Sequence, residues 1–172
     1  MRQHGDIRNQ FDAVEQSTGE ARRDAFRRLV HLLAVHETAE EEVLHPLART
    51  AFDGAEKVVE ARLAEEKEAK ELLARLDGMD TDDPKFLPEL ATLRTEVMRH
   101  ARAEERYEFI HLRRTASSAQ LATMARALEA AEKTAPTHPR PGTESATKNA
   151  LLGPLAAVVD RTRDAVRKAL GH

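Results

Sequence analysis

Two histidine–glutamate pairs with the same spacing could together hold metal ions. His36 and Glu40 are four residues apart, and His100 and Glu104 repeat the pattern further along the chain. On a helix, such residues lie about 40° apart around the axis and one turn apart along it, so both side chains can reach one ion. One such pair arises often by chance on a charged helix, as a surface ion pair. Both pairs here interrupt apolar stripes, which favours a buried metal site over two surface pairs.

The composition predicts a helical protein and excludes several classes of function. The chain has 172 residues, of which 33% are charged, 41% hydrophobic and 3% aromatic. It contains no cysteine, which excludes disulfides and thiolate metal sites. The net charge of −3 gives no bias toward nucleic acid. No uncharged apolar run approaches the ~18 residues of a membrane span, and the first residues lack the apolar stretch of a signal peptide. We therefore expect a soluble, cytoplasmic protein.

Apolar residues recur at helical spacing in four stretches joined by short connections. The predicted helices cover residues 2–16, 20–51, 55–77 and 84–114. Because short loops make neighbouring helices antiparallel, this order predicts an all-α, up-down-up-down four-helix bundle. Each stripe is interrupted by histidine or glutamate, and the connection lengths bring these interruptions to similar heights. They are His4, His36 with Glu40, Glu66, and His100 with Glu104.

The rest of the chain is expected to add helices at the C-terminal end. We divide the sequence into the bundle at residues 1–115, a short fifth helix at 116–134, a proline-rich linker at 135–146 and an amphipathic helix at 147–172. The last helix carries basic residues opposite its apolar side. It could dock on the bundle, pair with a partner or lie on a membrane surface, and docking or partial disorder is favoured.

The predicted bundle would bury Glu40, Glu66 and Glu104 together. A glutamate in a helical core costs several kcal/mol unless its charge is balanced, and like charges at close range oppose each other's ionisation. Bound cations remove this conflict. Three imidazoles and three carboxylates in one layer suit two cations, which carboxylates can bridge. Nitrogen and oxygen ligands without sulfur favour iron or manganese, with zinc also possible.

These motifs resemble the HHE (hemerythrin-like cation-binding) family over about residues 2–114. The supporting segments are HGDIRNQF after His4, AVHETAEEEVLHP and MRHARAEERYEF around the two pairs, and LAEEKEAKELL around Glu66. The C-terminal tail is similar to that of many actinobacterial members. The resemblance implies a four-helix bundle with an oxo- or hydroxo-bridged, non-haem di-iron centre that binds or reacts with O₂, NO or peroxide. It also implies that Glu40 and Glu104 bridge the irons while His4, His36 and His100 are terminal ligands.

Two departures from the family pattern bear on function. Glu66 stands where the family usually has a histidine, and the added negative charge should stabilise ferric iron and weaken reversible O₂ carriage. This favours, as an alternative, a ferroxidase or peroxidase-type di-iron enzyme. His4 lies in the first helical turn, which frays, so it is expected to be held weakly. A third possibility is a bundle that binds no metal and acts through protein interactions.

Several other residues with metal-binding or proton-transfer chemistry are not expected to contribute to the site. Tyr107 is interpreted as a tyrosine packed one turn above the site, with a role as a hydrogen-bond donor or ligand as the alternative. His45 should point about 180° away from His36, and His31 about 140° away. His111 lies about 16 Å along the helix from His100. His138 and His172 fall in the linker and at the terminus.

Overall fold

The computed structural model describes residues 2–49 and 53–134, which form helices and turns with no strand among them. In chain order the elements are α1 (Arg2–Gln16), α2 (Gly19–Ala39), the π-helix η1 (Glu40–Leu44), α3 (His45–Ala48), α4 (Ala55–Asp77), α5 (Phe86–Glu104), the π-helix η2 (Glu105–Phe109), α6 (Ile110–Thr115) and α7 (Ser118–Thr134). The all-α fold expected from the sequence is therefore confirmed.

The predicted helix limits agree closely with the observed ones. The first and third predicted helices coincide with α1 and α4. The second corresponds to the continuous run of α2, η1 and α3, and the fourth to α5, η2 and α6. That fourth helix begins at Phe86, two residues later than predicted, because Asp83 and Pro84 form a turn in which the Asp83 carbonyl accepts the Phe86 N–H at 2.9 Å.

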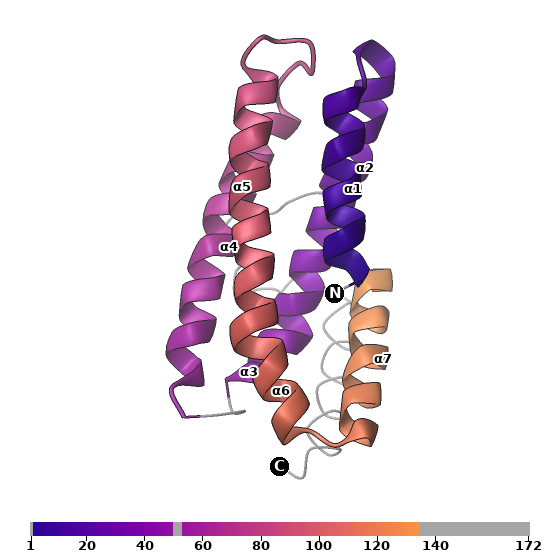
Figure 1. The fold of residues 1–172 in the computed structure, drawn as a ribbon. Helices are drawn as coiled ribbons and strands as arrows, with labels where there is room; N and C mark the ends of the chain where they lie inside the picture. The colour runs from indigo at the N-terminus through magenta and orange to yellow at the C-terminus, as the bar shows by residue number, and fades with distance from the viewer. Residues whose placement is uncertain (1, 50–52, 135–172) are drawn as a thin grey trace.

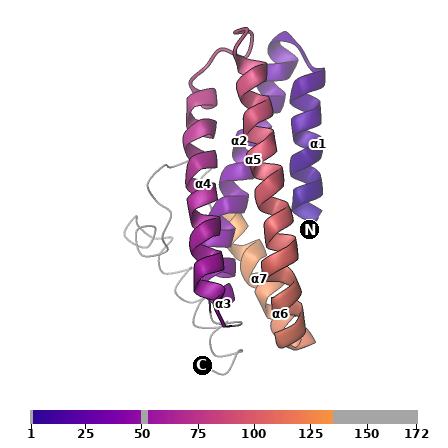
Figure 2. The same ribbon diagram turned by 60° about the vertical axis from the view of Figure 1, so that its left-hand side comes forward.

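Four helical columns run side by side along most of the molecule. The helix α1 packs against α2 and α5, while α4 packs against α5 and α2. Figures 1 and 2 show that α1 is shorter than its neighbours, so its N-terminus lies at mid-height while the other columns continue downward. The upper half of the bundle is thus formed by α1, α2, α4 and α5.

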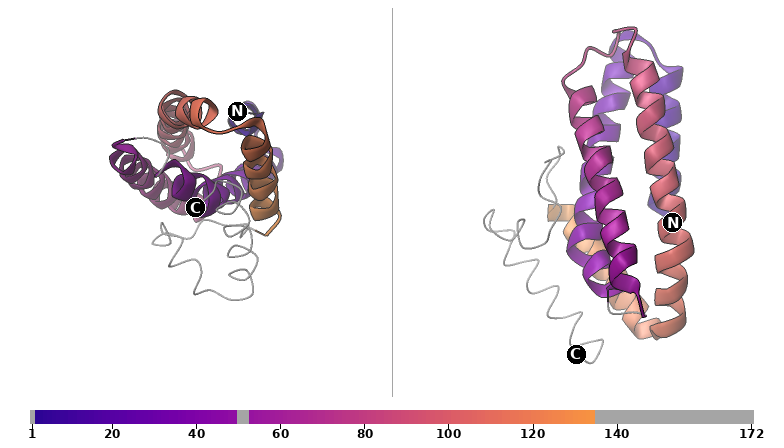
Figure 3. Two further views of the ribbon diagram at one scale, coloured as in Figure 1. Left: turned by 90° about the horizontal axis from the view of Figure 1, so that it is seen from below. Right: turned by 90° about the vertical axis from the view of Figure 1, so that its left-hand side faces the viewer.

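In the lower half, α7 takes the fourth corner. It packs against α2 and η1, and seen from below it stands beside α6 and across from α4 (Figure 3, left). Met124 of α7 is buried with Leu44 and Leu112 in one small apolar cluster, and Ala127 is buried with Ala39 and Val43 in a second. The helix α7 therefore packs against the π-helix η1 through a shared apolar cluster.

The main apolar core fills the upper half. It joins Ile7 and Phe11 of α1 to side chains of α2, α4 and α5, and Phe26 meets Phe86 edge to face with 4.9 Å between ring centroids. This core holds α1, α2, α4 and α5 together in the upper half of the bundle. Directly below it, buried polar residues take the place of apolar ones.

The predicted linker at 135–146 and the amphipathic helix at 147–172 lie outside the described residues. Among the helices that the structure does describe, none is long and apolar enough to cross a membrane.

Candidate metal centre

Two π-helical turns shape the polar layer, and each starts at or just after the glutamate of an HxxxE pair. The first, η1, begins at Glu40, and its widened turn ends with the His45 N–H donating to the Glu40 carbonyl five residues back. The second, η2, begins at Glu105, directly after Glu104. A π turn holds one residue more than an α turn, which rotates everything beyond it and is frequent at functional sites.

The first HxxxE pair meets His4 in the interior. His36 Nε2 lies 3.1 Å from Glu40 Oε1, and His4 Nε2 lies 3.9 Å from the same oxygen and 3.3 Å from Glu104 Oε2. Both histidines and both glutamates are buried. The structure therefore brings together His4, His36, Glu40 and Glu104, as the sequence predicted.

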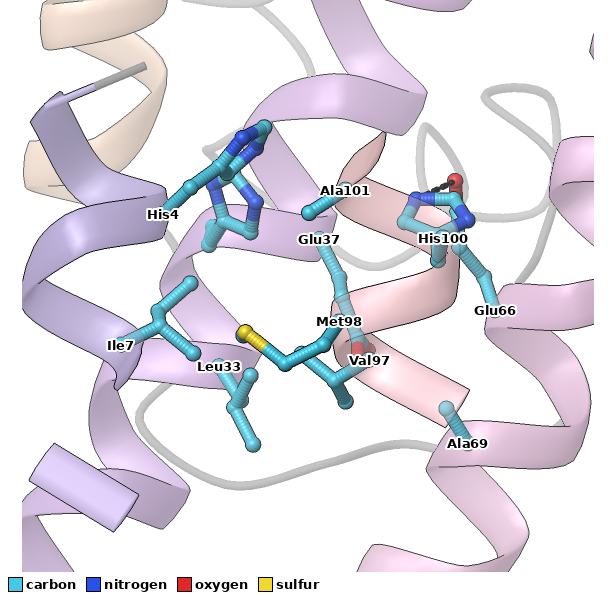
Figure 4. Close-up of a pocket in the computed structure, with 11 residues that line it drawn as sticks. His4, Ile7, Leu33, Glu37, Glu66, Ala69, Val97, Met98, His100 and Ala101 are labelled. Atoms are coloured by element: carbon cyan, nitrogen blue, oxygen red, sulfur yellow. Dashed lines mark ion pairs between the residues drawn. The ribbon is translucent and has the colours of Figure 1, made fainter. Parts of the chain in front are cut away.

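The second HxxxE pair meets Glu66 of α4. His100 Nε2 lies 3.6 Å from Glu66 Oε1, 3.7 Å from Glu104 Oε2 and 3.8 Å from Glu40 Oε2. Glu66 is only 1% exposed, so its side chain points into the bundle rather than to solvent. Figure 4 shows His100 and Glu66 close together on facing helices. All six predicted residues thus lie in one buried layer.

His45 is a seventh member of this layer, and the expectation that it points away is wrong. Its side chain is 2% exposed, with Nε2 against Glu66 and Nδ1 3.4 Å from Glu108 Oε2. In a regular α-helix it would stand about 180° from His36, but the extra residue in η1 removes about 100° of that angle. Pro46 was the available signal, because a proline breaks the regular hydrogen-bond ladder at this point.

The second π turn exchanges Tyr107 for Glu108 in the interior. In a regular α-helix Tyr107 would lie about 20° from the direction of His100, whereas with one extra residue Glu108 takes that place. Tyr107 is 49% exposed and Glu108 is fully buried. The interpretation of Tyr107 as a packed residue on the site face is therefore wrong.

Each predicted histidine is oriented through its Nδ1 atom. The Nδ1–H groups donate to oxygen acceptors: His4 to Glu105 at 2.9 Å, His36 to Gln3 at 3.0 Å and His100 to Glu65 at 3.2 Å. This hydrogen bonding leaves the Nε2 lone pairs directed at the centre, which is the arrangement that metal-binding imidazoles have in proteins.

His4 is held more firmly than its place in the first helical turn suggested. Besides its bond to Glu105, its ring stacks on Phe109 with 5.9 Å between centroids. Glu105 and Phe109 both belong to η2, so this π-helical turn holds the His4 ring in place. The expectation of a weakly held His4 is not what the geometry shows.

Bound protons offset part of the negative charge of the cluster, as the pKa values of its members show. Burial lowers the pKa of His4, but contacts with Glu104, Glu40 and Glu105 outweigh it and raise that pKa to about 10. Burial lowers the pKa of His36 to about 4. Burial, together with the charge of Glu40, raises the pKa of Glu104 to about 7. The residues thus compete for protons, as ligands of a shared cation would.

A buried lysine stands beside this layer. Lys70, one turn after Glu66 on α4, is 4% exposed and forms an ion pair with Glu41, which is 3% exposed. Burial raises the pKa of Glu41 to about 7 and that of the nearby Glu37 to about 8, although Lys70 acts against both shifts. Lys70 therefore balances part of the extra negative charge around Glu66.

The donor atoms fit metal ions. Three groups of residues bring one ligand atom each to within 4.8 Å of one another: His4, His36, Glu40 and Glu104; Glu40, Glu66 and His100; and His45, Glu104 and Glu108. Several of these atoms are buried and make no hydrogen bond in the described part of the chain, namely His4 Nε2, His100 Nε2, Glu40 Oε2, Glu66 Oε2, Glu108 Oε1 and both oxygens of Glu104. Buried donors and acceptors are rarely left unpaired, so this cluster of ligand atoms could hold cations.

Two curated proteins are similar in sequence to this chain. The chain is 27% identical over 138 residues to an uncharacterised hemerythrin-like protein of Schizosaccharomyces pombe, covering 79% of this chain and 68% of the relative. It is 29% identical over 130 residues to a DNA nickase of Nostoc sp., covering 75% of this chain but only 36% of the nickase.

The fold has a counterpart among crystal structures. A hemerythrin HHE cation binding domain-containing protein from Mycobacterium kansasii, described as an Rv2633c homolog, superposes with a TM-score of 0.65 at 20% identity over 94% of each chain. The family model of the hemerythrin HHE cation binding domain matches residues 1–112. With the motifs, the bundle and this match in agreement, the chain belongs to the hemerythrin HHE cation-binding domain family.

Proposed function

We propose that the protein is a hemerythrin-like, non-haem di-iron protein that binds or reacts with O₂, NO or peroxide. The observation that supports this best is the convergence, from four helical columns, of buried Nε2 and carboxylate atoms that make no hydrogen bond among the described residues. One ion would be held by His4, His36, Glu40 and Glu104, and the second by Glu40, Glu66 and His100. Glu40 belongs to both of these groups, and Glu104 belongs to the first and to the third group with His45 and Glu108, so both carboxylates would be shared between the ions.

We add His45 to the proposed ligands of the second ion. Its Nε2 atom already touches Glu66, and Glu108 holds the ring through Nδ1. A second imidazole on this side compensates for the glutamate at the position where histidine is usual, so that each ion has neutral nitrogen donors as well as carboxylates.

Iron is the metal that this donor set favours, with manganese or zinc also compatible. Iron bound here would supply a redox-active Lewis acid for small ligands. The chain itself supplies a small apolar pocket beside the ligands, lined in part by Ile7, Leu33 and Val97 (Figure 4). Its volume of about 10 Å³ leaves room for about one water-sized molecule beside the proposed ligands.

Ferroxidase or peroxidase turnover at the same centre is the second candidate. Glu66, Glu37, Glu41 and Glu108 make the layer unusually rich in carboxylates, and anionic donors favour ferric iron. Catalytic decay of peroxide by the iron-loaded protein would distinguish this activity from simple binding. The relationship to the nickase carries no argument for DNA cleavage, because the chain spans only about a third of that protein. The expected cytoplasmic location stays a prediction.

Metal analysis with an ultraviolet–visible spectrum tests the proposal. On protein purified without chelator or affinity metal, we expect about two irons per chain and the near-ultraviolet absorption of a bridged ferric pair. His36→Ala with His100→Ala should lose both, whereas His31→Ala, on the exposed side of α2, should lose neither. No metal after anaerobic supply of iron would overturn the proposal and leave the interaction-protein alternative.

A further inference from the structure

We propose that Arg62 of α4 is a positioning residue for the second ion and acts through Glu65 on the ring of His100. Arg62 lies four residues before Glu66, so the two side chains share one face of α4 at a distance of about one turn. Neither Arg62 nor Glu65 belongs to the three candidate metal groups among the described residues. The inference rests on the proposed function, because it concerns the chain's own support for one of the proposed ions.

Glu65 joins Arg62 to His100 through its two carboxylate oxygens. The Arg62 Nη2–H donates to Glu65 Oε1 at 2.9 Å, and the His100 Nδ1–H donates to Glu65 Oε2 at 3.2 Å. The three residues form a chain that ends at His100 Nε2, which lies 3.6 Å from Glu66 Oε1. Because both of its oxygens are engaged, the Glu65 carboxylate cannot turn without losing one of these bonds.

The burial of Arg62 separates this contact from an ordinary helix pair. An arginine and a glutamate three residues apart often pair on a helix surface, where the contact contributes little to stability. Arg62 is only 8% exposed, and its Nε and Nη1 atoms are buried without a hydrogen-bond partner in the described part of the chain. A solvated pair would avoid the cost of burying these groups. Holding Glu65 against His100 gives the buried position a function.

The support of His100 differs from that of the other two predicted histidines. The Nδ1–H of His36 donates to the neutral amide of Gln3, and that of His4 donates to Glu105, whose side chain is 40% exposed. The partner of His100 is instead a carboxylate that a buried arginine holds. Such a carboxylate orients the ring and raises its basicity as a ligand, and losing it typically costs about 10–100-fold in metal affinity.

Zinc affinity of the full chain tests this role, because zinc binds imidazole and carboxylate ligands without redox chemistry. In Arg62→Met we expect one of the bound zinc ions to bind about 10–100-fold more weakly. Arg75→Met removes an exposed arginine of the same helix and should leave zinc binding unchanged. Glu65→Gln removes the charge that Arg62 pairs with and should weaken the same ion, even if Arg62→Met fails to fold. No zinc binding by the unmodified chain, or equal affinity in Arg62→Met and Glu65→Gln, would overturn the proposal.

A double-mutant cycle separates positioning from a general loss of structure. Glu65→Ala removes the link, so adding Arg62→Met to it should cause no further loss of zinc affinity. An equal loss in both backgrounds would overturn the proposal, because Arg62 would then act without Glu65. In the zinc-loaded chain, the Nδ1–H resonance of His100 should shift in Arg62→Met while those of His4 and His36 stay in place. An unshifted His100 resonance would also contradict the proposal.

These zinc measurements keep the positioning role apart from the proposed function. A chain that shows the expected zinc effects but takes up no iron would refute the di-iron proposal alone. A chain that takes up about two irons, yet binds zinc equally well with and without Arg62, would refute the positioning role alone.

Discussion

Removing the metal should destabilise the protein strongly. Seven buried atoms of the proposed centre make no hydrogen bond among the described residues, counting one each on His4, His100, Glu40, Glu66 and Glu108 and two on Glu104. At about 1–3 kcal/mol for each buried atom without a hydrogen bond, the conflict amounts to at most about 7–21 kcal/mol, as large as the whole stability of a typical domain, and ion-pair contacts such as that between His4 and Glu104 at 3.3 Å offset part of it. Protons and water relieve part of it, as the raised pKa of His4, about 10, indicates. The remainder appears as metal-linked stability.

The size of the effect follows from mass action. An ion present at 1,000 times its dissociation constant adds about 4 kcal/mol, so two ions add about 8 kcal/mol. For a chain of this length each kcal/mol shifts the melting temperature by about 2–4 °C, which predicts a fall of roughly 16–32 °C on metal removal.

Circular dichroism melting of iron-loaded and chelator-treated protein at equal concentration measures this directly. His31→Ala should keep the full difference because His31 is exposed, and His36→Ala with His100→Ala should abolish it. If the metal-free and loaded chains melted at the same temperature, the reasoning about unpaired buried donors would be refuted, whatever metal the protein carried.

Four further outcomes are expected. Glu66→Ala should halve the iron content, and unchanged stoichiometry would remove it from the ligand set. His45→Ala should likewise weaken one ion while sparing the other, whereas full retention of both would make His45 a structural residue only. Lys70→Met leaves the buried Glu41 carboxylate without its cation, so urea unfolding should show a loss of about 3–5 kcal/mol, and a loss below 1 kcal/mol would contradict a buried ion pair. Burial raises the pKa of Glu37 to about 8 in the folded chain, above its ordinary 4.5, so its protonated form favours folding below about pH 4.5 and that contribution is lost as pH rises through about 8. Melting of the metal-free protein across this window should therefore flatten in Glu37→Gln, and an unchanged pH profile would count against the shift.

Helical periodicity was sufficient to predict most of the fold and to place the six predicted ligands in one buried layer. The stripe of α4 gave its limits correctly because no residue between Ala55 and Asp77 interrupts the regular ladder, and Glu66 followed from its place on that stripe. The positions of His36 and His100 were equally accessible, because each HxxxE pair lies before the π turn that disturbs the register.

The same periodicity failed beyond each π turn. A regular α-helix with 3.6 residues per turn would direct the His45 side chain away from the bundle interior and the Tyr107 side chain into it. The extra residue in each of η1 and η2 changes both directions. Pro46 marks η1 in the sequence, but nothing comparable marks η2, whose segment ERYEF is composed of ordinary helix residues. The contact between His45 and Glu108 joins two different helical columns, so it can be recognised only in the folded structure.

The packing partners of α7 could not be predicted from the sequence either. An amphipathic stripe shows which face of a helix is buried, but it does not show which element covers that face. Its Ala127 packs on Ala39 and Val43, which flank and form η1, so the fifth helix supports the turn that directs His45 inward. On the other side, η2 supplies Glu105 and Phe109 to His4 and Glu108 to His45. Both proposed ions therefore depend on the two wide turns, and one of these turns depends on α7. Loosening α7 should weaken metal binding even though no side chain of that helix belongs to the three candidate metal groups among the described residues.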